Sequence, residues 1–231
     1  MPIEVSVQFV DMYSSDTTQD TVWVSNSLEL LTLHLREYLP HVVSVEAWCD
    51  NAATYHNAEI ARFSPLIFHC QNIELQSIRF FEAGEGKSLL DRHFATVRHG
   101  ILDRLASGLP FDRLTHVSEV LRQLTSVYTY QLTPNRNTPS VVSKRKITAI
   151  ASYHDWRYHY HDERVTARFY KEVFAEHPSV APGYTEQISY LQPLFNMNLP
   201  NTLPRTGGSH QKDTLGDVRS LPSLLGVTGC N

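Results

Sequence analysis

The sequence predicts an α/β protein in which parallel strands alternate with crossover helices. The first observation is three apolar segments of strand length, at residues 3–10, 42–48 and 73–81. The second is the pair of helix-like segments that separate them. The third is a turn at Gly84 and Gly86, placed between the last strand and a long amphipathic helix. Together these features predict a sheet with helices packed against it.

The first half of the chain follows this alternation. Residues 3–10 alternate apolar and polar side chains, as a half-buried strand does. Residues 21–24 fit either a second short strand or the start of a helix over 28–39, which Ser25 or Ser27 would cap. Residues 42–48 are rich in valine and predict a buried central strand.

The next two segments are a helix and a strand. Residues 58–70 predict a helix that breaks near Pro65, because proline removes a backbone donor. Residues 73–81 then predict the third strand of the sheet.

The long helix after the glycine turn has one apolar stripe. Its members recur at helical spacing and are Leu90, Phe94, Val97, Ile101 and Leu105. This pattern predicts that the stripe faces the core.

The second half of the chain is less regular. The pattern predicts a helix over 114–124, a loop or lid over 128–142, a strand over 147–160 and a short helix over 165–175. The expected organisation is a core of residues 1–125, an insertion or accessory subdomain of 126–195, and a tail of 196–231 that is disordered or loosely docked.

Composition excludes several classes of protein. The net charge of −4 gives no general attraction to nucleic acid or anionic membranes, so any DNA binding needs a local patch. No apolar run reaches transmembrane length, and the three cysteines form no CxxC pair that would suggest a zinc site. We therefore expect no membrane association and a nuclear or cytoplasmic location. A homo-oligomer is possible on the sequence alone.

Two aspartates stand where chemistry is expected in such a fold. Asp50 ends the strand over 42–48, and Asp91 lies at the start of the long helix. If the two strands before them are neighbours, both carboxylates face one crevice at the carboxyl edge of the sheet. Carboxylates at such a crevice suit Mg²⁺ or Mn²⁺. The alternative is structural: Asp50 caps a turn, and Asp91 complements a helix dipole.

The residues around both aspartates suggest a family. Residues 50–57 read DNAATYHN, and residues 80–92 read FFEAGEGKSLLDR. Over residues 3–105 the chain resembles transposase-derived proteins with a ribonuclease H-like fold. This resemblance implies a mixed sheet flanked by helices and a DDE/D catalytic triad that uses Mg²⁺ or Mn²⁺ to cut and transfer DNA strands.

When the two motifs are matched position by position, Asp50 resembles the second acidic residue of the triad and Asp91 resembles the third. The resemblance makes residues 3–10 the family's third strand, so its first strand is expected before Met1 and the chain would be truncated at that end. Asp11 is the stand-in for the first catalytic carboxylate, and Glu82 is a spare metal ligand at a strand end.

Three functional hypotheses follow. The first is a metal-dependent transposase or nuclease, with Lys87, Arg92 and Arg98 contacting DNA phosphates. The second is an inactive transposase relic that binds nucleic acid or a protein partner. The third is an unrelated α/β protein in which both aspartates serve turns.

The histidines of the second half form a separate candidate. His159 and His161 would share one face of a strand, and a zinc site would also need His154 or Asp162. A strand with packed aromatic side chains and solvated histidines is the favoured interpretation.

Overall fold

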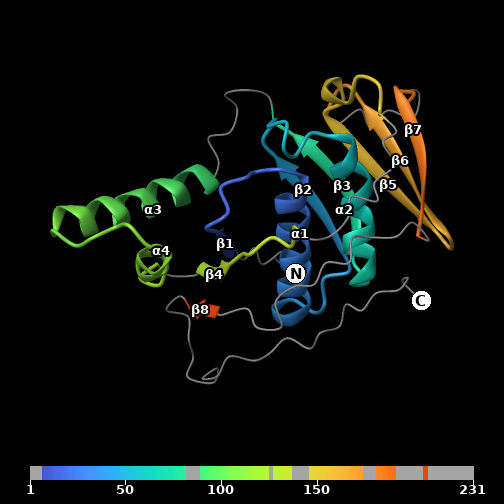
Figure 1. Cartoon of the computed structure of the whole chain (residues 1–231). Helices are drawn as coiled ribbons and strands as arrows, with labels where there is room; N and C mark the ends of the chain where they lie inside the picture. Colours follow the sequence, from blue (N-terminus) through green and yellow to red (C-terminus); the bar gives the residue numbers. More distant parts are fainter. Residues whose placement is uncertain are drawn as a thin grey trace, which may run out of the picture. The chain divides into compact units, whose positions relative to one another are not determined.

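The structure, a computed structural model, describes residues 7–81, 89–124, 127–136, 146–173, 180–190 and, for the backbone, 205–207. The chain forms two compact units, drawn in Figure 1. Unit 1 comprises residues 1–17, 87–133 and 199–223, and unit 2 comprises residues 18–86, 134–198 and 224–231. Each unit is therefore discontinuous in sequence, and the expected boundaries at 125 and 195 both fall inside a unit.

Unit 2 contains a five-stranded mixed sheet, which Figure 1 shows with its strands labelled. These strands, in spatial order, are β2 (Ser44–Cys49), β3 (Glu74–Phe80), β5 (Asp155–His161), β6 (Arg164–Tyr170) and β7 (Tyr184–Ser189). The pair β2 and β3 is parallel, as the alternation of strands and helices predicts, and the other neighbours are antiparallel. The predicted α/β class is thus confirmed, and so is the mixed sheet flanked by helices that the resemblance implies.

Two helices cover one face of this sheet. They are α1 (Thr21–Tyr38) and α2 (Ala58–Cys70), which pack against each other (Figure 1). α1 begins earlier than expected because Asp20 caps it: its Oδ1 accepts a hydrogen bond of 3.0 Å from the Trp23 amide. The apolar core of the unit includes fully buried Trp156, Tyr158 and Phe169 from the sheet.

The predicted break at Pro65 does not occur. α2 runs through this proline without interruption. Proline cannot donate to the carbonyl four residues earlier, which is that of Ala61. The Tyr158 hydroxyl supplies the missing donor, at 3.0 Å from the Ala61 oxygen. A side chain from the sheet therefore compensates for a defect in the helix.

The prediction of a buried central strand over 42–48 was wrong. β2 lies at one edge of the described sheet, and its side chains alternate between half-buried and exposed. Val43, which precedes the strand, is 68% exposed, and Trp48 is 40% exposed. Apolar composition alone does not separate an edge strand from a central one.

The sheet of unit 2 also carries a row of charges across three of its strands. Arg79 pairs with Glu46 on β2 at 2.8 Å, and its Nε lies 3.7 Å from Asp155 Oδ1 on β5. Arg157 Nη2 contacts the other oxygen of the Asp155 carboxylate at 2.8 Å. Asp155 is fully buried, so these two arginines compensate a charge that water does not reach.

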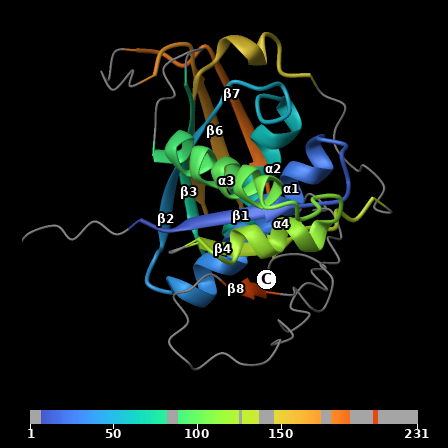
Figure 2. The same ribbon diagram turned by 90° about the vertical axis from the view of Figure 1, so that its left-hand side faces the viewer.

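Unit 1 has a smaller sheet with two helices. The strands β1 (Phe9–Tyr13) and β4 (Val127–Gln131) are parallel, and β8 (Arg205–Gly207) pairs antiparallel with β4. The helices are α3 (Leu89–Ala106) and α4 (Leu114–Leu121), and α4 packs against both α3 and β4 (Figure 2). None of the described helices is long and apolar enough to cross a membrane.

The expected inward stripe of α3 is wrong in orientation. Leu90, Phe94 and Leu105 are each about half exposed, and His93 is the buried residue of this helix. Gly100 faces α4 instead, because a Cβ there would lie 2.8 Å from a Val120 methyl. The side of α3 that approaches α4 closely is thus the side of Gly100, and much of the apolar stripe is exposed.

Four segments of the second half adopt strands that the sequence did not predict. Residues 128–142 were expected to be a loop, yet β4 occupies 127–131. Residues 165–175 were expected to be a helix, yet Val165, Ala167 and Phe169 alternate into the core from β6. Strands also occur at 184–189 and, within the expected tail, at 205–207.

Candidate functional site

Asp50 lies where the parallel strands β2 and β3 both end. The Phe81 amide donates to the Cys49 carbonyl at 3.0 Å, so the chain leaves the two strands side by side. Asp50 is exposed, and its Oδ1 accepts a hydrogen bond of 3.1 Å from the Ala52 amide. The condition set out from the sequence, that these two strands are neighbours, is thus met, and Asp50 has the turn hydrogen bond of the structural alternative.

The segment from Asp50 to Asn57 is held by its own backbone and side chains. The amides of Tyr55 and His56 both donate to the Ala52 carbonyl, at 3.0 and 2.9 Å. Asn57 caps α2 by accepting from two backbone amides at 3.0 Å each. A turn fixed in this way presents Asp50 on a defined backbone.

His56 fastens this segment to the sheet. One ring nitrogen contacts the Asn51 side chain, and Nε2 donates to the Tyr153 carbonyl at 2.8 Å. The ring stacks on Phe80 with centroids 4.0 Å apart. Burial lowers the pKa of His56, which favours a neutral ring with its proton on Nε2. His56 therefore has a structural role in the segment over residues 50–57 that contains Asp50.

The other predicted metal ligands are distributed differently. Asp91 lies exposed in the first turn of α3, in unit 1, whereas Asp50 belongs to unit 2. Glu82 and Lys87 lie outside the described residues. Within the described ranges, no group of three or more histidine, cysteine, aspartate or glutamate side chains is arranged to hold a metal ion.

Asp11 makes a side-chain hydrogen bond that the sequence did not suggest. Its two carboxylate oxygens lie 2.8 and 2.9 Å from Nε2 of His93 on α3. The imidazole is buried and stacks on Phe9, with ring centroids 4.1 Å apart. The stand-in for the first catalytic carboxylate thus serves as the partner of a histidine 82 positions away.

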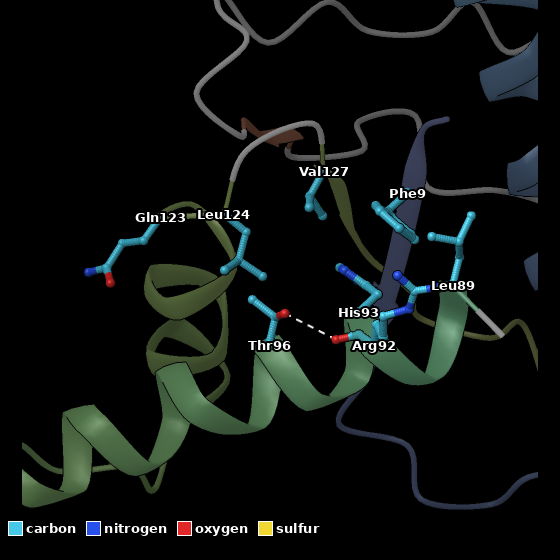
Figure 3. A pocket seen from close by; sticks show the side chains of 8 residues that line it. All are labelled: Phe9, Leu89, Arg92, His93, Thr96, Gln123, Leu124 and Val127. Carbon is cyan, nitrogen blue, oxygen red and sulfur yellow. Dashed lines mark hydrogen bonds between the residues drawn. The ribbon is translucent and has the colours of Figure 1, made fainter. Parts of the chain in front are cut away.

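A pocket of about 370 Å³ opens beside His93, the partner of Asp11 (Figure 3). Phe9 of β1 and Val127 of β4 line it from the sheet of unit 1. α3 contributes Leu89, Arg92, His93 and Thr96, and the segment just after α4 contributes Gln123 and Leu124.

No family model, no curated protein and no solved structure matches this chain. The interpretation of both sites therefore rests on the chain's own residues.

The predicted phosphate contacts on α3 are accessible. Arg92 and Arg98 are both exposed, and Arg92 lines the pocket. Neither arginine makes an ion pair with the described residues. Exposed guanidinium groups are compatible with contacts to an anion.

The histidines of β5 do not form a metal site among the described side chains. His159 and His161 are exposed, and His161 Nε2 contacts the Thr166 hydroxyl at 3.1 Å. His154 lies instead against His56, with ring centroids 5.6 Å apart. The interpretation of a packed aromatic strand with solvated histidines agrees with this arrangement.

Proposed function

We propose that the chain descends from DDE/D polynucleotidyl transferases and cleaves DNA strands with Mg²⁺ or Mn²⁺ held by Asp50 and Asp91. The observation that supports this proposal is the position of Asp50, exposed at the edge where parallel β2 and β3 both end. Ligands bind at this edge in open sheets with parallel strands.

The type of donor at Asp50 suits a hard divalent ion. Among the described residues, only one of its two carboxylate oxygens accepts a hydrogen bond. Asp91 would supply a second carboxylate, and Glu82 a third. A bound ion of this kind activates water and stabilises the leaving oxygen of a phosphodiester.

The chain's own residues would have two further tasks. The hydrogen bonds of Ala52 and His56 would keep the Asp50 carboxylate at the sheet edge. Arg92 and Arg98, with Lys87, would contact DNA phosphates and position the strand.

A second candidate is a non-catalytic relic that binds nucleic acid or a protein partner. It is favoured by the pairing of Asp11 with His93, which occupies the stand-in for the first carboxylate. The lack of a three-ligand group among the described side chains favours it as well.

Calorimetry with Mn²⁺ and nicking of supercoiled plasmid DNA distinguish the two candidates. We expect the full chain to bind Mn²⁺ and to nick DNA, and both Asp50→Asn and Asp91→Asn to abolish each property. Glu163→Gln, which removes a carboxylate from an exposed turn between β5 and β6, is the matched control and should change neither. Mn²⁺ binding that is insensitive to Asp50→Asn would refute the metal site. DNA binding without nicking would support the relic.

A further inference from the structure

The pocket of unit 1 combines a cation with hydrocarbon walls. Figure 3 shows Arg92 and His93 reaching from α3 toward Phe9, with Leu124 and Val127 on the facing side. The lining also includes Leu89, so four of its side chains are purely hydrocarbon. Such a lining, apolar with a few placed polar groups, is typical of small-molecule sites.

The two basic side chains of the pocket differ in whether they already have a partner. His93 is committed, because Nε2 is held by both oxygens of Asp11 and its ring is stacked on Phe9. The Asp11 carboxylate is turned to the imidazole and is not among the residues that line the pocket. Arg92 is exposed, and its guanidinium makes no ion pair or hydrogen bond to the described residues.

The Thr96 side chain completes the polar edge. Its hydroxyl donates to the Arg92 carbonyl at 3.0 Å, as the dashed line in Figure 3 shows. Because this hydroxyl donates its one hydrogen to the helix backbone, it can only accept a hydrogen bond from a ligand. The lining therefore presents Arg92, a cation without an ion-pair partner among the described residues, beside an apolar surface that includes the stack of half-buried Phe9 on buried His93.

We propose that this pocket binds a small amphipathic organic anion, with its carboxylate on Arg92 and its apolar chain against Leu124 and Val127. The guanidinium recognises a carboxylate through two parallel hydrogen bonds. The hydrocarbon walls favour transfer of the ligand's chain from water. A ligand that is only an anion would make no use of the apolar walls, and a ligand that is only apolar would make no use of the arginine. A ligand with both parts uses the whole site.

Octanoate, octan-1-ol and inorganic phosphate separate the two contributions. The full-length chain, labelled with ¹⁵N, is titrated with each probe while amide shifts are followed by NMR. We expect octanoate to shift the amides of Thr96, Leu124 and Val127. Octan-1-ol, which keeps the chain and lacks the charge, should bind at least about tenfold more weakly, as should phosphate alone.

The variant Arg92→Gln tests the carboxylate contact. It should weaken octanoate binding at least about tenfold and leave octan-1-ol binding unchanged. Arg122→Gln removes an exposed arginine at the end of α4 that does not line the pocket, so it should bind octanoate as the unaltered chain does. The amide spectrum of each variant shows directly that it is folded.

Three results would overturn the proposal. They are equal affinity for octanoate and octan-1-ol, shifts from octanoate that lie away from the pocket, and an Arg92→Gln variant with unchanged affinity. Because no DNA or metal ion is present in the titration, its outcome is independent of the function proposed for Asp50 and Asp91.

Discussion

Replacement of Glu29 by glutamine should make the protein more stable at alkaline pH. Glu29 lies on α1, is only 5% exposed, and its Oε2 has no hydrogen-bond partner in the described part of the chain. Burial raises the pKa of this carboxyl from 4.5 to about 8, because a charge without a partner is disfavoured away from water. Glutamine has nearly the same shape and cannot ionise.

The magnitude and the sign follow from the two pKa values. The folded chain holds the proton more tightly than the unfolded chain, so the stabilisation is complete below pH 4.5 and is lost as the pH rises through about 8. A pKa difference of about 3.5 corresponds to roughly 5 kcal/mol in the free energy of unfolding, as an upper value. The advantage of Glu29→Gln should therefore grow by several kcal/mol as the pH rises from about 5 to about 8.5.

Urea unfolding followed by tryptophan fluorescence measures this difference. The three tryptophans, Trp23, Trp48 and Trp156, all belong to unit 2, so their fluorescence reports on the unit that contains Glu29. Glu37→Gln, at an exposed position of the same helix, is the matched control and should follow the unaltered chain. Stability curves for Glu29→Gln and the unaltered chain that stay parallel across this pH range would refute the reasoning.

Three further substitutions test contacts within unit 2 by the same fluorescence measurement. Asn57→Ala removes the cap of α2 and should cost about 1 kcal/mol; no change would mean that the two capping hydrogen bonds are unimportant. Arg79→Met leaves buried Asp155 short of one positive partner and should cost about 3 kcal/mol, whereas a stabilised variant would show that hydrocarbon serves this position better. Tyr158→Phe leaves the Ala61 carbonyl without a donor beside Pro65 and should cost about 2 kcal/mol; an unaffected midpoint would argue against the compensation of the proline.

The elements of the first half could be predicted because their periodicity is a local property. The strand over Glu74–Phe80 and the helices over Ala58–Cys70 and Leu89–Ala106 appear where the patterns place them. The prediction of which side chains of α3 are buried was wrong. The α3 stripe is largely exposed while Gly100 approaches Val120 of α4, and no pattern within α3 encodes a contact with another helix.

The segment over Arg164–Tyr170 shows the same limit for element type. Its apolar residues fit a short helix or a strand, and pairing with β5 and β7 on either side decides for the strand. Interactions between distant residues override a weak local preference in such a short segment.

The candidate sites divide in a similar way. The position of Asp50 at a strand end was visible in the sequence, and its turn hydrogen bond was the alternative weighed there. The partnership of Asp11 and His93 was missed, because a single histidine in a helix gives no sign of a carboxylate 82 positions away. The one available signal was that His93 lies beside the apolar stripe rather than opposite it.

The alternating connectivity of the two units limits how the protein can be divided. The chain passes from one unit to the other near residues 17, 86 and 133, so no continuous stretch of sequence encodes either unit whole. A fragment that stops at residue 86 would carry β3 beside β2 but without β5, so Ile78 would lose its pairing with Trp156 and the Phe80 amide would lose its acceptor, the His154 carbonyl. Fragments cut near residue 86 or 133 would each hold parts of both units and would have to reassociate before either unit could be complete.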